Sequence, residues 1–128
     1  MKIRILGNSV RLRLSQTEIK EILETGRVVQ TVKFSPKASQ QLHYALEKAD
    51  VSAIQATFDG NEICVQIPVE MANDWASGSE VSLENSMPID GKEQLRILVE
   101  KDFKCIDARK GEDESDLFPN PAETHGAK

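Results

Sequence analysis

A step of 53 residues repeats in this chain, and it constrains the fold more than any other feature of the sequence. The shift needs no gap and produces seven identities over roughly fifty positions: Gly7-Asn8 on Gly60-Asn61, Val28 on Val81, Gln41-Leu42 on Gln94-Leu95, and Glu47-Lys48 on Glu100-Lys101. Apolar positions also match, because Val10, Leu12 and Leu14 fall on Ile63, Val65 and Ile67. Self-similarity at a fixed period indicates one supersecondary unit used more than once. The sequence therefore predicts two equivalent units related by a pseudo-two-fold axis.

The first copy predicts two strands, a helix and two further strands. Polar and apolar residues alternate on both sides of Gly7-Asn8, which is typical of a β-hairpin over residues 2–14. Ser15 and Glu18 have the spacing of a capping box, so a helix should begin there and end near Gly26. Residues 27–34 and 42–47 then predict two more strands. The alternation assigns these hairpin side chains to the interior: Ile3, Ile5, Val10, Leu12 and Leu14.

The second copy repeats this order, with a turn at Asp59-Gly60-Asn61 and a helix that starts after Pro68 and carries a core Trp75. Four short strands and one helix cannot close a core alone, whereas two such units can. We therefore predict a mainly β fold with two short helices, in which a tandem β-β-α-β-β repeat forms a pseudo-two-fold barrel. One domain should cover residues 1–109, with repeat one at 1–50 and repeat two at 54–103.

The last segment, residues 110–128, differs from the repeats in composition. It is acidic, polar and contains Pro, which predicts a flexible tail outside the barrel. Leu117 and Phe118 are bulky apolar residues within it and resemble a short docking motif, either for the chain's own barrel or for a partner. The acidic run at 112–114 could bind a divalent cation, although such runs more often only solvate a tail.

Charge is divided unequally along the chain. Residues 1–50 carry nine Lys/Arg and five Asp/Glu, for a net charge of +4, whereas residues 51–110 carry six and eleven, for −5. Residues 111–128 add a net charge of −4. The total of −5 argues mildly against a nucleic-acid binder. Because residues 1–50 carry the net positive charge, any contact with a polyanion should use this first half. A basic protein partner would instead suit the second half and the tail.

Two segments resemble a known family. GNSVRLRLSQTEIKEIL and GNEICVQIPVEMANDW are each followed by a Val-containing strand and by a strand that ends in an acid–base pair. They are similar to the GNS-x-x-V-R-I-P-x-E pattern of the AbrB/MazE swapped-hairpin domains, in which two chains interleave hairpins to make one barrel. The resemblance spans residues 1 to about 102 and implies a swapped-hairpin barrel fused in tandem. The whole chain also resembles a group of small bacterial proteins with an EKDF…FPNP tail.

The AbrB/MazE resemblance implies a non-enzymatic regulatory module that binds DNA through the outward basic face of the first hairpin. The residues at the matching positions are Lys2, Arg4, Asn8, Ser9, Arg11 and Arg13. The corresponding positions of the second hairpin hold the uncharged residues Gln55, Thr57, Cys64 and Gln66. The four cations could contact the phosphates of DNA or another polyanion, or they could form an ordinary solvated face that limits edge pairing.

Two other functions stay open on the sequence alone. The first is an antitoxin-like protein-interaction module that uses the acidic surface of repeat two and the tail. The second is a small hydrolase with a polar tunnel, although the apolar inward positions favour a packed interior. The chain has no Gly-rich phosphate loop, Ser/His/Asp order or carboxylate pair on a defined face, so no catalytic residue, metal site or cofactor is expected.

The remaining reactive side chains suggest no site. Cys64 and Cys105 are too few for a disulfide scaffold, and Cys105 is the better nucleophile candidate because basic residues flank it. His43 and His125 lie far apart and are expected to be structural or on the surface. No apolar run is long enough to span a membrane, and the first residues lack an apolar signal segment. We therefore expect a cytoplasmic protein without membrane contact, as a monomeric pseudo-dimer or a weak homodimer.

Overall fold

The computed structural model describes residues 1–103 of the chain. In its first half the elements are β1 (Lys2–Ile5), β2 (Ser9–Leu14), α1 (Gln16–Thr25), β3 (Arg27–Lys33), a short 3-10 helix η1 (Ala38–Gln40) and β4 (Gln41–Ala49). In its second half they are β5 (Gln55–Asp59), β6 (Glu62–Pro68), α2 (Val69–Ser77), β7 (Ser82–Asp90) and β8 (Glu93–Lys101). The fold is therefore mainly β with two helices, and the predicted order of strands and helices occurs twice.

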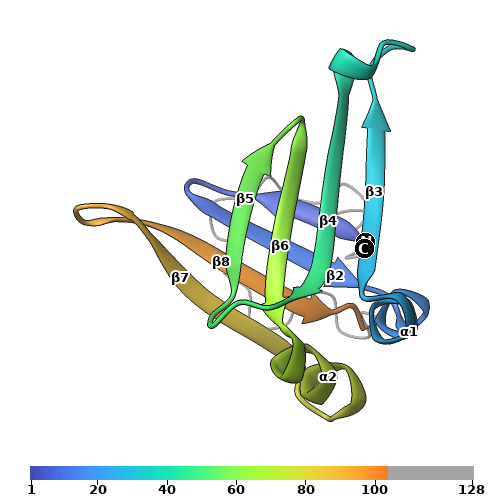
Figure 1. Ribbon diagram of the computed structural model, residues 1–128, viewed down its shortest axis with the longest axis vertical. Coiled ribbons are helices and arrows are strands. Elements are labelled where there is room, and N and C mark those ends of the chain that lie inside the picture. Colours follow the sequence, from blue (N-terminus) through green and yellow to red (C-terminus); the bar gives the residue numbers. More distant parts are fainter. Residues whose placement is uncertain (104–128) are drawn as a thin grey trace, which may run out of the picture.

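The strands form two four-stranded sheets, and each sheet contains strands from both halves of the chain (Figure 1). The first sheet has the order β1-β2-β8-β7 and the second has the order β3-β4-β6-β5. Within each sheet, two antiparallel hairpins meet along one parallel pair, β2 with β8 and β4 with β6. The two parallel pairs share a register. Ser9 lies opposite Arg96, and 53 residues away on each strand Glu62 lies opposite His43.

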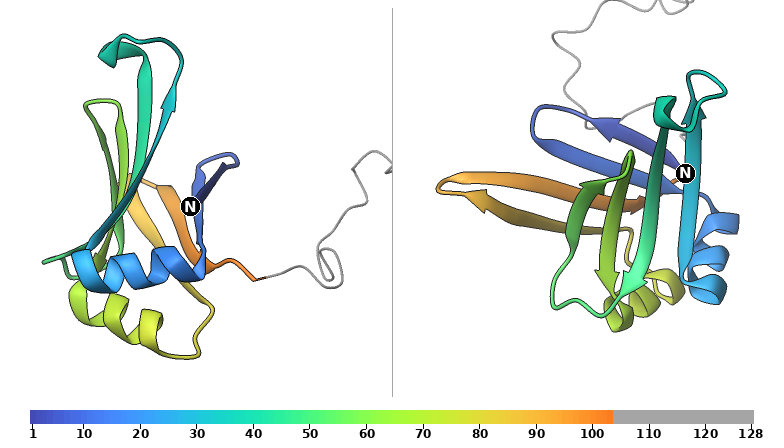
Figure 2. Two further views of the ribbon diagram at one scale, coloured as in Figure 1. Left: turned by 90° about the vertical axis from the view of Figure 1, so that its right-hand side faces the viewer. Right: turned by 45° about the horizontal axis from the view of Figure 1, so that its top comes forward.

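The closed barrel expected from the sequence is not formed. The described strands make two separate sheets, which diverge from the end of the molecule where the helices lie (Figure 2). Closure would require the edge strands to pair further, but β1 has only four residues, and β7 contains Pro88, which has no N–H to donate. A register shift between Pro88 and Asp90 also makes the pairing of β7 with β8 irregular near the end of the strand. The result is two sheets that pack face to face at one end only.

The repeat also contains a gap that the sequence comparison did not reveal. Val28 of β3 lies opposite Leu46 of β4. The 53-residue shift matches Leu46 with Val99 of β8, and Leu83 of β7 lies opposite Val99. Leu83, which is 55 residues beyond Val28, is therefore its structural equivalent, and the identity between Val28 and Val81 is coincidental. Two extra residues between α2 and β7 account for the difference.

The helices begin and end where the sequence predicts. Ser15 accepts a hydrogen bond from the Glu18 N–H, while the Glu18 carboxylate accepts one from the Ser15 N–H, which completes the capping box. Gly26 has a φ of 84°, in the left-handed region that favours glycine, and it ends α1. Helix α2 follows Pro68 directly. The two helices pack against each other across the end where the sheets converge (Figures 1 and 2). Neither is long and apolar enough to cross a bilayer, and no other helix within residues 1–103 is.

The apolar core lies between the two sheets, next to the helices. Leu12 and Val65, which the repeat places at equivalent positions, are both fully buried, and so is Trp75 of α2. The Trp75 Nε1 donates a hydrogen bond to the Val81 backbone oxygen at 3.1 Å. Residues 1–103 contain no buried polar or charged residue. Ile5 was predicted to point inward but is 59% exposed, because it lies at the free tip of its hairpin, beyond the core.

Candidate nucleic-acid interface

The four cations predicted from the first hairpin lie together on the outward face of the first sheet. Antiparallel pairing of β1 with β2 places Lys2 opposite Arg13 and Arg4 opposite Arg11. All four alternate along their strands with residues that pack in or against the core, so they share the opposite side of the sheet. Lys2 and Arg4 are exposed, whereas Arg11 and Arg13 are half-buried.

Acidic residues from the second half of the chain lie against these cations. Like charges on neighbouring strands repel, so a carboxylate among them is stabilising. Strand β8 runs parallel to β2, and the Oε1 atom of its Glu100 lies 3.2 Å from the Nε atoms of both Arg11 and Arg13. Just after β8, the Asp102 carboxylate lies 2.9 Å from the Lys2 Nζ. The cations are therefore partly neutralised by the other repeat.

Arg96 of β8 adds a fifth cation to the same face. It lies opposite Ser9, which faces outward, and forms an ion pair with Glu84 of β7 at 2.5 Å. Ser9 itself donates a hydrogen bond from its Oγ to the Leu6 backbone oxygen at 2.6 Å. Arg4 forms no ion pair with any other residue of 1–103. We call this surface the basic face; its cations are Lys2, Arg4, Arg11, Arg13 and Arg96.

Asn8, a predicted DNA-binding residue, holds the hairpin turn to the neighbouring strand. Its Nδ2 donates to the Gln94 backbone oxygen at 2.7 Å, and its own backbone oxygen accepts from the Arg96 N–H at 3.1 Å. The turn of the second hairpin is held in the same way, because the Asn61 backbone oxygen accepts from the His43 N–H at 2.9 Å. The repeated Gly-Asn pair therefore has a structural explanation in both halves.

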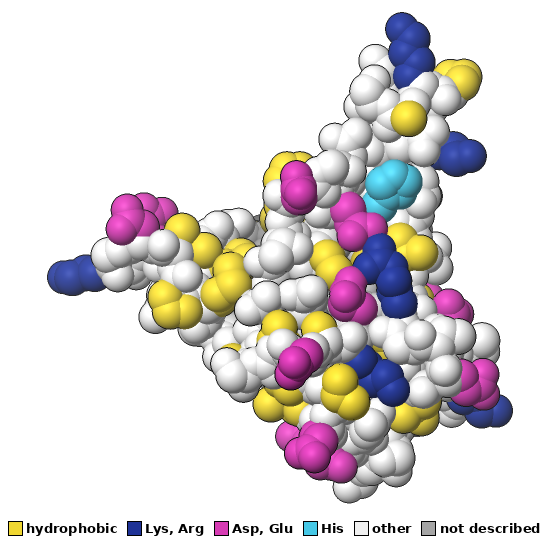
Figure 3. Space-filling model, in the orientation of Figure 1, with side chains coloured by type: hydrophobic (Ala, Val, Ile, Leu, Met, Phe, Trp, Pro, Cys, Tyr) yellow, Lys and Arg dark blue, Asp and Glu magenta, His cyan; other side chains and the backbone are white. Residues whose placement is uncertain are grey.

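The outward face of the second sheet has a different chemistry (Figure 3). Acidic side chains, a histidine and basic side chains mix there. Arg27 of β3 forms ion pairs with Glu47 of β4 and Glu62 of β6. The Cys64 thiol, at the position that matches Arg11, donates a hydrogen bond to the Glu47 Oε1 at 3.0 Å. In this network two carboxylates surround one cation, so the face has no excess of cations.

The Cys64 thiol is not set up as a nucleophile. Its burial raises its pKa to about 12, and its hydrogen bond to the Glu47 carboxylate acts in the same direction. The same hydrogen bond, together with the positive charge of Arg27, holds the pKa of Glu47 below its usual value. Since the thiolate is the reactive form, a thiol with this pKa is almost unreactive near neutral pH.

The other candidates from the sequence do not assemble into a site within residues 1–103. No group of three or more His, Cys, Asp or Glu side chains there is arranged to hold a metal ion. His43 pairs with Thr31, with 2.8 Å between Nδ1 and Oγ1. The acidic residues of repeat two are spread over several elements, for example Glu70 and Asp74 on α2, Glu84 on β7 and Glu93 on β8.

The predictions for the tail concern residues outside the described range. They include the docking pair Leu117 and Phe118, the thiol of Cys105, and His125. Sequence reasoning missed Arg96, Glu84 and Glu100 at the basic face. The identity between Glu47 and Glu100 pointed to Glu100, but it predicts a contact with the first hairpin only when β8 is known to lie beside β2.

Comparison with known proteins identifies a family. A family model described as a family of unknown function, DUF7009, matches residues 1–122, which include both repeats and part of the tail. The chain belongs to DUF7009. No curated protein and no solved structure matches the chain. The basic face is therefore the starting point for a functional proposal.

Proposed function

We propose that the chain is a non-enzymatic binding module of the AbrB/MazE type that binds DNA, or another polyanion, on the basic face. In this proposal the chain is a swapped-hairpin pseudo-dimer fused in tandem. The sheet pairing supports the exchange of hairpins, because β1-β2 of one half pairs with β7-β8 of the other, and β5-β6 pairs with β3-β4. The matching registers of the two parallel pairs support the pseudo-two-fold relationship.

The observation that carries the proposal is the convergence of five cations from three strands on one sheet face. Phosphates attract such a face and release counterions when they bind. The carboxylates of Glu100, Asp102 and Glu84 lower its net charge, so binding should be weak at physiological salt. Only one of the two related faces has this excess, which makes the contact asymmetric. The antitoxin-like alternative has less support, because the acidic residues of repeat two are dispersed.

Fluorescence anisotropy with short duplexes, at low and at moderate salt, tests the proposal. About three or four phosphate contacts predict a slope of log K against log salt of roughly −3. Arg4→Ala/Arg11→Ala should weaken binding and make the slope shallower. Lys33→Ala/Lys37→Ala removes the same charge from the far tip of the second sheet and should leave binding unchanged. Absence of binding at low salt, or equal losses in the two double variants, would refute the proposal.

A further inference from the structure

The free end of the second sheet carries apolar side chains that the described residues leave open. Val32 of β3 lies opposite Leu42 of β4, and Phe58 of β5 lies opposite Ile63 of β6. Each is an even number of residues away from a core residue of its own strand, so all four side chains lie on the side of the sheet that faces the core. Phe58 is nevertheless 71% exposed and Val32 is 40% exposed. We call this surface the apolar end face; its residues are Val32, Leu42, Phe58 and Ile63.

The divergence of the two sheets explains why this surface is open. The core closes where the helices pack, and the second sheet extends away from that end, where no strand or helix of residues 1–103 covers its inner side (Figure 2). Phe34, just after β3, is 74% exposed and adds to the apolar surface. Large apolar side chains that cluster on a surface mark interaction sites. The apolar end face therefore has the composition of an interaction surface whose partner lies outside residues 1–103.

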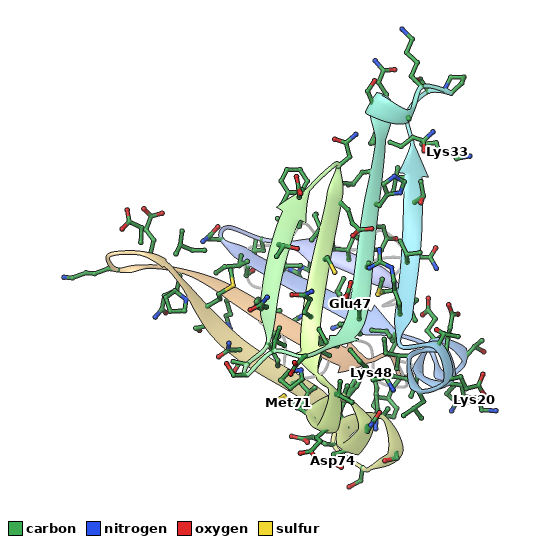
Figure 4. All side chains as sticks on the ribbon, in the orientation of Figure 1. Lys20, Lys33, Glu47, Lys48, Met71 and Asp74 are labelled. Atoms are coloured by element: carbon green, nitrogen blue, oxygen red, sulfur yellow. The ribbon has the colours of Figure 1, made fainter. Side chains whose placement is uncertain are left out.

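Basic residues lie at the tip of the hairpin next to this surface, where Lys33 ends β3 on the opposite side of the strand from Val32 and Lys37 follows in the loop. Lys33 and Lys37 are exposed at the end of the β3–β4 hairpin, and neither forms an ion pair within residues 1–103. Figure 4 places Lys33 at the end of β3. A segment that covers the apolar end face should therefore combine bulky apolar residues with acidic ones.

We propose that the segment around Leu117 and Phe118 of the same chain docks on the apolar end face. Leu117 and Phe118 follow the acidic run Glu112-Asp113-Glu114-Ser115-Asp116, which supplies the charge that complements Lys33 and Lys37. Burial of a Leu and a Phe side chain is the main stabilising contribution, and aromatic contact with Phe58 adds to it. The DUF7009 match extends to residue 122, so it includes this segment.

The length of the chain permits this contact. Fourteen residues separate Phe103 from Phe118, and in an extended conformation they can span about 45–50 Å. The nine-residue strand β4, which runs from the free end of the second sheet to the helix end, is about 30 Å long. The segment can therefore reach the apolar end face from Phe103 with length to spare.

Two-dimensional amide NMR on the full chain tests the proposal, which does not depend on polyanion binding. Leu117→Ser/Phe118→Ser should shift the amide signals of Val32, Leu42, Phe58 and Ile63, and dilution should not change the effect. Ala122→Ser/His125→Ser is the matched control in the same tail and should leave those signals in place. Lys33→Glu/Lys37→Glu, at exposed positions that do not threaten folding, should reproduce part of the shifts.

Hydrogen exchange supplies a second measurement. The amides of Leu117 and Phe118 should exchange at least about tenfold more slowly in the wild type than in Lys33→Glu/Lys37→Glu, equivalent to about 1.4 kcal/mol. Three outcomes would overturn the proposal. The shifts could be absent, they could fall instead on the pocket at the start of α1 around Ile19, Ala76 and Phe103, or they could grow with concentration, which would indicate docking between two copies.

Discussion

Glu47 and Glu100 occupy matching positions in the two halves of the chain, and each holds together the outward face of a different sheet. Glu100 contacts Arg11 and Arg13, both at 3.2 Å, whereas Glu47 contacts Arg27 and accepts a hydrogen bond from Cys64. The carboxylate is the same in both halves, and the residues around it determine the charge of each face. Glu100 lies among cations of the basic face, whereas Glu47 shares a single cation, Arg27, with a second carboxylate, Glu62.

This relationship gives a direct test of the polyanion proposal. Glu100→Gln removes the carboxylate that competes with phosphate for Arg11 and Arg13, so duplex affinity at low salt should rise several-fold. Glu47→Gln makes the same change at the matching position of the other sheet and should leave duplex affinity unchanged. Anisotropy titrations at a fixed salt concentration measure both effects. An affinity that falls in Glu100→Gln would show that the basic face does not bind the duplex.

The core should be sensitive at Leu12. Its side chain is fully buried between the two sheets, so Leu12→Ala should lower the free energy of unfolding by about 2–5 kcal/mol. Val29, on the outward side of β3, is 45% exposed, and Val29→Ala should cost no more than about 1 kcal/mol. Urea denaturation of both variants provides the comparison. Equal losses would show that the two sheets do not pack through β2.

The thiol of Cys64 should make stability depend on alkaline pH. Its folded pKa of about 12 lies above the ordinary value of 9.0, so its contribution is fully present below about pH 9 and is lost as the pH rises through 12. Cys64→Ala should therefore unfold with a weaker dependence on pH between these limits. Thermal unfolding at several alkaline pH values measures this, and identical profiles for the two proteins would contradict the assignment.

The same thiol should resist alkylation in the folded protein. A pKa of about 12 instead of 9.0 lowers the thiolate fraction at pH 8 on the order of a thousandfold. In a Cys105→Ser background, iodoacetamide should therefore label Cys64 very slowly. Labelling in urea is the control and should be fast. Rapid modification of the native protein would show that Cys64 is exposed or ionised.

Lys48 should stabilise the contact between the two helices. Its Nζ donates to the Leu23 backbone oxygen at 3.2 Å, near the end of α1, and to the Asn73 Oδ1 of α2 at 3.0 Å (Figure 4). A cation at a helix C-terminus and a charged hydrogen bond together suggest that Lys48→Met costs about 1–2 kcal/mol. Lys20→Met, at an exposed position of α1, should change stability by no more than about 0.5 kcal/mol. Urea midpoints of the two variants compare them.

The repeat predicted the order of the elements because each element follows from local chemistry. Alternation around Gly7-Asn8 favours a hairpin, the side chains of Ser15 and Glu18 cap a helix, and Gly26 supplies the left-handed residue that ends it. These preferences act over a few residues and need no knowledge of the rest of the chain. The burial of Leu12 and Val65 followed from the same alternation.

The tertiary structure decided which hairpins pair, and with that the composition of the basic face. Arg13 and Glu100 are 87 residues apart in sequence and become neighbours only because β2 lies parallel to β8. The openness of the sheets, the two-residue gap before β7 and the exposure of Ile5 and Phe58 also depend on how far the sheets stay packed. Local alternation specifies which side of a strand is apolar, but it does not specify which surface will cover that side. The covering surface is determined by the packing of segments that are distant in sequence, and the free energy gained from this packing must exceed the entropy lost when long loops close.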